Sequence, residues 1–196
     1  MPRKPDARLE GRILDAAYHL WTKGGEDALT MRAVARAART TTPTLYQRFR
    51  DKDILLKLLR AHAVDKLVCA LEPADTAAGT CRLFLEFAQR HPNEYRLLVA
   101  DWAVRLSRKD RKPSFELIKS RLAKDLGGAP AQHTRLALSL GEILHGTATM
   151  LLAEGVHERV AKELRDACLG ACESMIEHAS REPARWKSTD IEGMQD

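Results

Sequence analysis

The sequence predicts an all-α protein in which a three-helix N-terminal domain is joined by a long helix to a second helical domain. Three observations carry this prediction. Apolar residues recur at the helical period of 3.6 along almost the whole chain of 196 residues. Residues that start and stop helices separate these segments, and no pattern typical of a β-hairpin occurs.

The first predicted helix covers residues 7–23, and the pair Gly24 and Gly25 ends it because glycine adopts backbone conformations that other residues avoid. Thr30 is placed to cap a second helix over residues 31–38, whose apolar residues share one face. These two segments are amphipathic, so each is expected to bury one side.

A short third helix is predicted over residues 42–48. The preceding Thr-rich segment suits a helix entrance, because a Thr hydroxyl can accept a free backbone amide and Pro43 is tolerated in the first turn. Leu45 and Phe49 would then face inward. A turn of three or four residues therefore separates the second and third helices.

Asp51 is placed to cap a longer helix over residues 52–71, which Pro73 ends. Polar loops and glycine or proline breaks divide the rest of the chain. The further helices predicted there cover residues 76–90, 92–106, 114–126, 129–154 and 156–180.

The predicted domains are residues 1–52 and residues 53–180, and the polar residues 181–196 are expected to form a disordered tail. The basic excess belongs to the first of these regions. Thirteen Lys and Arg face seven Asp and Glu up to Arg60, whereas nineteen face twenty in the remainder. A basic domain joined to a nearly neutral one is typical of a protein in which only the basic domain binds phosphate groups.

Three short helices with a tight turn before the third make a helix-turn-helix, and the basic charge makes double-stranded DNA the expected partner. In the third helix, Gln47 can pair with an adenine edge, and the Thr and Pro side chains can touch a thymine methyl group. Hydroxyl and basic side chains nearby can bind phosphates, Arg36 among them. The predicted DNA-binding residues are Thr30, Arg32, Thr41, Thr42, Pro43, Thr44, Tyr46, Gln47, Arg48 and Lys52.

The segment from Ile13 to Leu56 combines a long first helix with paired alanines, a glycine stop, and the motif T-L-Y-x-x-F followed by K-D-x-L-L. With this pattern it resembles the DNA-binding domain of TetR-type transcriptional regulators. Two positions depart from it. Arg39 stands where the turn usually has glycine, which costs about 1 kcal/mol if φ is positive there. Arg48 replaces a common histidine and keeps a donor for phosphate.

The resemblance implies that the remaining helices form a ligand-binding and dimerisation domain. The segments FLEFAQRHPNEYRLLVADW and LHGTATMLLAEG are similar to one C-terminal type of that family. A small, mostly apolar ligand would then bind between helices, with Arg105 and Glu142 as further polar contacts; plain core packing is the alternative. The candidate lining residues are Phe84, Phe87, Tyr95, Leu98, Trp102, Phe115, His145, Thr149 and Met150.

The last two long helices, residues 129–154 and 156–180, are apolar on more than one face, which is typical of helices buried on two sides. They suit a four-helix interface between two identical chains. If Leu140 and Leu144 face the mate, an arginine at either position should yield monomers. The protein is thus predicted to act as a homodimer, a ligand-responsive repressor on a palindromic operator.

Other functions find little support in the sequence. The pairs Glu142/His145 and Glu154/His157 would lie ~18 Å apart on one helix and cannot share a metal. Cys168 and Cys172 are expected to be buried reduced thiols. No common phosphate-loop, nucleophile or zinc-enzyme motif is present, so neither a cofactor nor enzyme activity is expected.

The expected location is the cytoplasm, because the N-terminus lacks an apolar secretion signal and no apolar run is long enough to span a membrane. The alternatives left open are a helical adaptor, a ferritin-like bundle without DNA binding, and an enzyme. Binding of duplex DNA that weakens with salt separates a regulator from an adaptor, and turnover would identify an enzyme.

Overall fold

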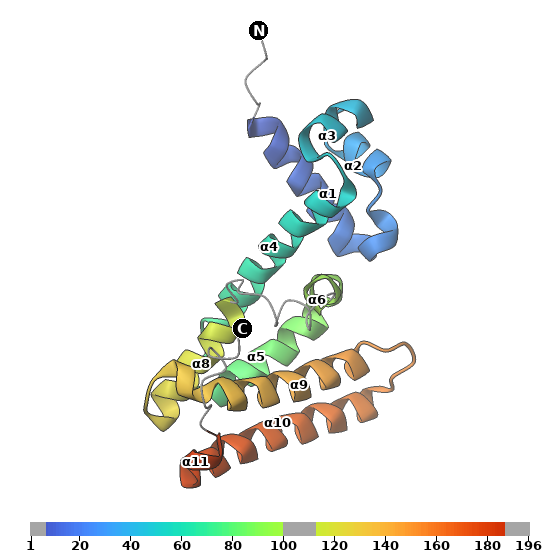
Figure 1. Ribbon diagram of the computed structural model, residues 1–196. Helices are drawn as coiled ribbons and strands as arrows, with labels where there is room; N and C mark the ends of the chain where they lie inside the picture. Colours follow the sequence, from blue (N-terminus) through green and yellow to red (C-terminus); the bar gives the residue numbers. More distant parts are fainter. Residues whose placement is uncertain (1–6, 100–112, 187–196) are drawn as a thin grey trace, which may run out of the picture. The chain divides into compact units, whose positions relative to one another are not determined.

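A computed structural model describes residues 7–99 and 113–186, and every regular element within these ranges is a helix (Figure 1). The all-α prediction is confirmed there. The elements are α1 (Ala7–Ala28), α2 (Met31–Ala37), α3 (Thr42–Phe49), α4 (Lys52–Leu71), α5 (Ala77–Arg90), α6 (Pro92–Val99), α8 (Pro113–Leu126), η1 (Pro130–His133), α9 (Thr134–Leu151), α10 (Glu158–Arg181) and α11 (Pro183–Trp186).

These helices form two compact units. The first contains α1, α2 and α3, the part of α4 up to Asp65, and α6 from Asn93. The second contains α4 from Lys66, α5 and the helices from α8 onward. The sequence placed the division after Lys52 and assigned residues 92–106 to the second domain. The difference arises because α4 continues through both units and α6 packs against α1.

The glycine pair interrupts α1 as the sequence predicts. Gly25 has φ 61° and ψ −144°, a conformation that residues with a side chain rarely adopt. The helical turns then resume and reach Ala28, five residues beyond the predicted end at Lys23. The kink therefore redirects the chain toward α2 without a long loop.

Apolar side chains from α1 to α4 fill the core of the first unit. Ile13, Val34, Leu45 and Leu55 are all fully buried. Along α4 the buried positions recur every four residues, which makes a single apolar stripe; they are Leu55, Leu59, Ala63, Leu67 and Leu71. Burial of each leucine side chain in this stripe contributes ~1.5–3 kcal/mol.

The second unit is built around α5, which contacts α8, α9 and α10. Helices α9 and α10 lie side by side (Figure 1). Leu140 and Leu144 of α9 are 1% and 6% exposed in the single chain, so they pack inside their own unit. The condition that these two residues face a second copy is therefore not met, because both side chains are already buried within a single chain.

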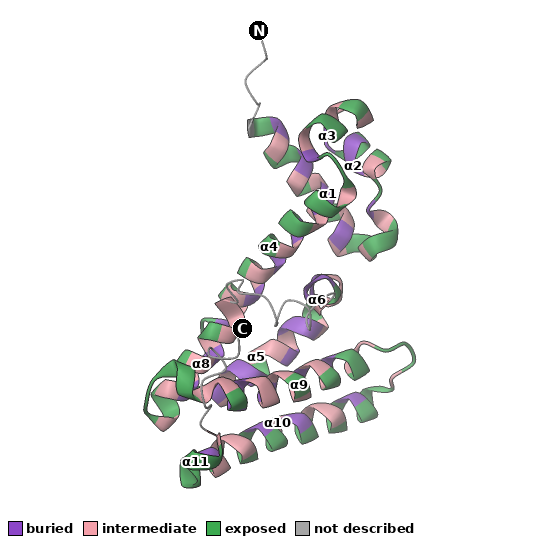
Figure 2. Ribbon diagram, in the orientation of Figure 1, coloured by how far each residue is buried: buried purple, intermediate pink, exposed green. Residues whose placement is uncertain are grey.

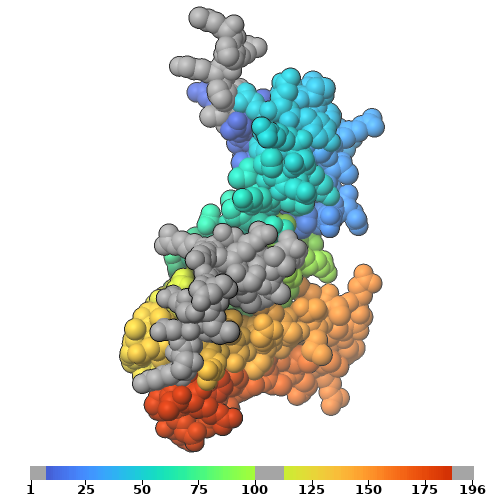
Figure 3. Space-filling model, in the orientation of Figure 1, coloured from blue at the N-terminus to red at the C-terminus, as the bar shows by residue number. Residues whose placement is uncertain are grey.

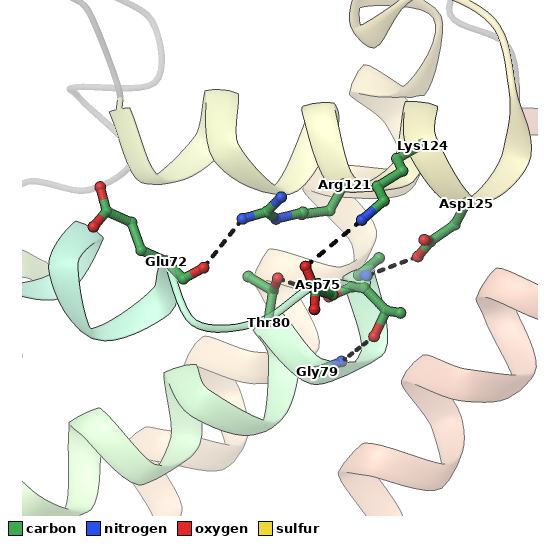
Figure 4. A network of polar contacts seen from close by, with 9 residues as sticks. Glu72, Asp75, Gly79, Thr80, Arg121, Lys124 and Asp125 are labelled. Atoms are coloured by element: carbon green, nitrogen blue, oxygen red, sulfur yellow. Dashed lines mark hydrogen bonds and ion pairs between the residues drawn. The ribbon is translucent and has the colours of Figure 1, made fainter.

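Polar side chains of α8 hold the segment between α4 and α5 (Figure 4). Arg121 donates to the carbonyl of Glu72 at 3.2 Å, and the Asp125 carboxylate accepts the backbone amide of Ala77 at 2.7 Å. Lys124 pairs with Asp75 at 3.6 Å. The contacts of Arg121 and Asp125 satisfy backbone groups that helix ends leave without an intrahelical partner.

Some predicted boundaries shift. The predicted helix over residues 129–154 begins with η1 and ends at Leu151, and α10 starts at Glu158 with the His157 ring accepting the Arg159 amide. The predicted tail is helical at its start: α10 reaches Arg181, and Trp186 of α11 packs edge-on against His178. The prediction for residues 187–196 lies outside the described residues.

Candidate DNA-binding surface

The turn between α2 and α3 is closed by backbone hydrogen bonds. The amide of Thr40 donates to the carbonyl of Ala35 at 2.9 Å, and that of Arg39 donates to Arg36 at 3.2 Å. This pair of bonds is a Schellman motif, which needs a left-handed residue at the position of Arg39. Arg39 accordingly has φ 53°. The turn thus adopts the conformation for which glycine is usual.

Threonine side chains cap both helices of the motif, as the sequence predicts. Thr30 Oγ1 accepts the amide of Ala33 at 3.1 Å at the start of α2. Thr41 Oγ1 accepts the amide of Thr44 at 3.3 Å at the start of α3, and the two hydroxyl oxygens lie 2.8 Å apart. Each cap stabilises its helix by about 1 kcal/mol.

Helix α3 divides into a buried and an exposed side. Leu45 and Phe49 are 0% and 4% exposed and anchor the helix in the core. Tyr46 is 47% exposed, and Gln47 is also on the surface. Figure 2 shows exposed residues along α2 and α3. The polar side of α3 is therefore accessible to a partner.

The structure buries none of the ten predicted DNA-binding residues. Six are exposed: Thr30, Arg32, Thr41, Pro43, Tyr46 and Gln47. Four are half-buried: Thr42, Thr44, Arg48 and Lys52. All ten belong to α2, α3, the first residue of α4 or the cap positions before these helices.

Two of the predicted cations already have acidic partners on α1. Arg48 Nη1 lies 3.2 Å from Glu10 Oε1, and Lys52 Nζ lies 3.5 Å from Glu26 Oε1. Neither pairing was predicted from the sequence, because the partners are 38 and 26 residues apart. The only available signal was the presence of Glu on a helix of an otherwise basic domain.

Helix α6 is bound to the first unit by several polar contacts that the sequence did not reveal. Trp21 Nε1 donates to the carbonyl of Asn93 at 2.7 Å, and Asn93 Nδ2 donates to the carbonyl of Thr22 at 3.0 Å. The Tyr18 hydroxyl donates to Glu94 at 3.3 Å. Arg60 of α4 donates to the carbonyl of Leu97 at 3.2 Å. Both α1 and α4 therefore hold α6.

In the second unit, the structure brings two of the candidate ligand residues together. The rings of Phe84 and His145 meet edge to face with centroids 5.1 Å apart. Burial lowers the pKa of His145 to about 4, so its imidazole is neutral at pH 7. A neutral imidazole beside an aromatic ring suits an uncharged ligand group.

The remaining candidate ligand residues are dispersed. Phe87 is buried against His91, and Phe115 lies under the Lys119 ammonium group. Tyr95 and Leu98 are buried in α6 and so belong to the first unit. Thr149 is exposed and Met150 is 56% exposed, which puts both on the surface rather than around an enclosed space. Glu142 is exposed, and Trp102 and Arg105 lie outside the described residues.

The cysteines of α10 are buried, as expected. Contact with the Cys81 thiol and burial raise the pKa of Cys172, and burial raises that of Cys168. Among residues 7–99 and 113–186, no three His, Cys, Asp or Glu side chains are arranged to hold a metal ion. No helix in the described part of the chain has the length and apolar character needed to cross a membrane.

A capped helix-turn-helix with an exposed polar face, followed by an all-helical second unit, defines a DNA-binding regulator. Comparisons with known proteins agree. Residues 13–59 match the model of bacterial regulatory proteins of the tetR family, and residues 77–172 match that of the tetracyclin repressor-like C-terminal domain. The chain belongs to the TetR family of transcriptional regulators, whose members are in general DNA-binding proteins without enzymatic activity.

One curated relative is the HTH-type transcriptional repressor KstR of Mycolicibacterium smegmatis, 38% identical over 69 residues. That match covers 35% of this chain, and the chain spans about a third (34%) of the relative.

Solved structures share the fold across nearly the whole chain. A TetR-like transcriptional regulator from Rhodococcus sp. RHA1 is 23% identical with a TM-score of 0.55, covering 90% of this chain and 98% of that one. A TetR variant from Acinetobacter baumannii AYE, in complex with minocycline, is 18% identical with a TM-score of 0.62, covering 91% and 98%.

Proposed function

We propose that this protein is a ligand-responsive repressor that binds a palindromic operator as a homodimer in the cytoplasm. The observation that carries the proposal is the exposed polar face of α3, whose opposite face is buried in the core through Leu45 and Phe49. The name of the relative KstR, a transcriptional repressor, supports repression as the direction of control.

In this proposal α3 lies in the major groove. Gln47 pairs with the edge of an adenine, and Pro43 and Thr44 contact a thymine methyl group. Lys52 binds a phosphate, which positions the domain without reading the sequence. One chain presents one such helix, so it reads one half-site, and two chains related by a twofold axis read a palindrome.

The proposed dimer interface is the exposed side of α9 and α10. The two helices form a continuous surface in Figure 3. Gly146 on α9 and Gly170 on α10 are exposed, and a Cβ atom at either would meet open space within its own chain. Small residues let helix backbones approach closely, and Ala167 and Ala171 extend the small-residue surface of α10.

The proposed ligand is a small, mostly apolar molecule bound among the helices of the second unit. The contact between Phe84 and the neutral His145 supports this class. The minocycline complex of the Acinetobacter baumannii TetR variant shows that a protein of the same fold binds a small molecule.

Ligand binding is proposed to weaken operator binding through the helices that join the units. Helix α4 contributes residues to both units, and α5 of the second unit is followed directly by α6 of the first. A ligand that shifts these helices would change the spacing of the two reading helices. The expected coupling free energy is ~1–3 kcal/mol. Thermodynamic linkage requires that bound DNA lower the affinity for the ligand by the same factor by which the ligand lowers the affinity for DNA.

Selection of duplexes from a random-sequence library tests DNA binding. The selected sites should be palindromic, and affinity for them should fall steeply with salt because Lys and Arg release counterions from phosphate. Gln47→Ala should change the preferred bases, whereas Lys52→Ala should weaken all sequences alike. Salt-independent binding, or binding to single strands only, would favour a helical adaptor.

A compound found by thermal-shift screening tests ligand response. Its affinity should be lower when the operator is bound, and His145→Ala should weaken the compound while DNA affinity without the compound stays nearly unchanged. Equal affinity for the compound in the two states would show that the site does not regulate DNA binding.

A further inference from the structure

We propose that Arg48 is a positioning residue, which fixes the orientation of α3 through its ion pair with Glu10, so that an acidic residue of α1 contributes to base discrimination. The inference rests on the proposed reading of DNA by α3. It changes the role expected for Arg48, which the sequence assigned to a phosphate contact.

The geometry of Arg48 favours a contact between α3 and α1 over a contact with phosphate. Arg48 is in the last turn of α3, and its Nη1 atom lies 3.2 Å from Glu10 Oε1, which belongs to α1. The side chain of Arg48 is 21% exposed and that of Glu10 is 45% exposed. A largely covered guanidinium group that already binds a carboxylate has fewer donors free for phosphate.

Apolar packing alone leaves the rotation of α3 loosely defined. The helix has eight residues, and Leu45 and Phe49 bury it from one side. Hydrophobic burial is non-directional, whereas a charge-assisted hydrogen bond has a preferred distance and angle. Readout of base edges requires side chains held within ~0.5 Å of their productive position. The Arg48–Glu10 pair supplies the directional contact near the C-terminal end of α3.

The ion pair between Lys52 and Glu26 is more exposed than the pair between Arg48 and Glu10, so it can serve as the control. Lys52 Nζ lies 3.5 Å from Glu26, and the two side chains are 37% and 73% exposed. Lysine is a flexible point charge, so it can leave Glu26 for a phosphate at little cost. The negative charge of Glu26 therefore only weakens DNA binding. The charge of Glu10 also weakens it, but Glu10 in addition fixes the orientation of α3 through Arg48.

The experiment compares Glu10→Ala with Glu26→Ala in the full chain, since each variant removes one negative charge from α1. The probes are a duplex selected from a random library by the wild-type protein and a scrambled duplex of equal length and composition. The specificity ratio is the affinity for the first divided by that for the second. Circular dichroism confirms that both variants are folded.

The two variants are expected to diverge. In Glu26→Ala both duplexes bind more tightly and the ratio stays within about twofold. In Glu10→Ala the scrambled duplex binds at least as tightly as it binds the wild-type protein. The specificity ratio nevertheless falls about tenfold, which is comparable to the loss of one base contact. Glu10→Gln, whose amide oxygen can still accept from Arg48, should lose less of the ratio than Glu10→Ala.

Salt dependence gives the second readout. If Arg48 is held by Glu10, Arg48→Met leaves the slope of log affinity against log salt unchanged. A phosphate contact at Arg48 would lower that slope by ~0.9 and overturn the inference. An unchanged ratio in Glu10→Ala would also overturn it. A wild-type protein that prefers no duplex at all would instead refute the proposed function.

Discussion

Replacing Arg39 by glycine should stabilise the protein, because the backbone at this position is left-handed. Arg39 has φ 53° and closes the Schellman motif at the end of α2. A left-handed residue with a side chain costs roughly 1–2 kcal/mol, and glycine avoids this cost. Glycine in turn gives the unfolded chain more freedom, which offsets ~0.5–1 kcal/mol. The difference between the two ranges is ~0–1.5 kcal/mol, so the net gain expected for Arg39→Gly is about 0.7 kcal/mol.

Thermal unfolding followed by circular dichroism measures this gain. For a chain of this size 1 kcal/mol corresponds to roughly 2–4 °C, so a rise in Tm of ~1–4 °C is expected for Arg39→Gly. Arg39→Ala is the matched control, because it removes the same side chain but keeps the strained backbone. If Arg39→Ala gains as much as Arg39→Gly, the side chain and not the backbone conformation is the source of the strain.

Four further predictions concern single side chains. Burial lowers the pKa of His145 to about 4, so the unfolded chain binds a proton that the folded chain excludes as the pH falls from 6.5 to 4; urea unfolding should show up to about 3 kcal/mol lost over that window, and His145→Leu should abolish the loss. Asp51→Ala should cost ~1 kcal/mol in the same assay, since Asp51 accepts the Ile54 amide at 2.9 Å. Leu140→Arg should unfold the second unit instead of yielding folded monomers, which circular dichroism and sedimentation together distinguish. Gly170→Ala should raise helix stability by up to about 1 kcal/mol but weaken the dimer in sedimentation, and a dimer unaffected by Ala171→Arg would place the interface elsewhere.

The helix-turn-helix could be predicted from the sequence because its determinants are local. Thr30 and Asp51 cap helices through amides three residues further along the chain. The left-handed turn at Arg39 follows from the usual glycine of the family at that position. Such contacts involve neighbours in sequence, so residue type and spacing contain most of the information needed.

The contacts that the sequence did not predict join distant segments. Trp21 donates to the carbonyl of Asn93, which is 72 positions further along the chain. The sequence around either residue does not indicate that the two are partners. The apolar periodicity of α9 showed that Leu140 and Leu144 are buried but not by which helix. Periodicity indicates how much of a helix surface is buried, and only the tertiary packing determines which helices bury it.

The placement of α6 limits how such a protein can be recombined. The first unit is discontinuous in sequence, since it ends at Asp65 and resumes at Asn93. A hybrid regulator made by joining the first 52 residues to another protein's sensor would leave Trp21 without its acceptor at Asn93 and the amide of Asn93 without Thr22. The exchangeable module therefore includes α6, and a sensor grafted onto it has to supply one segment between Asp65 and Asn93 and a second segment after α6.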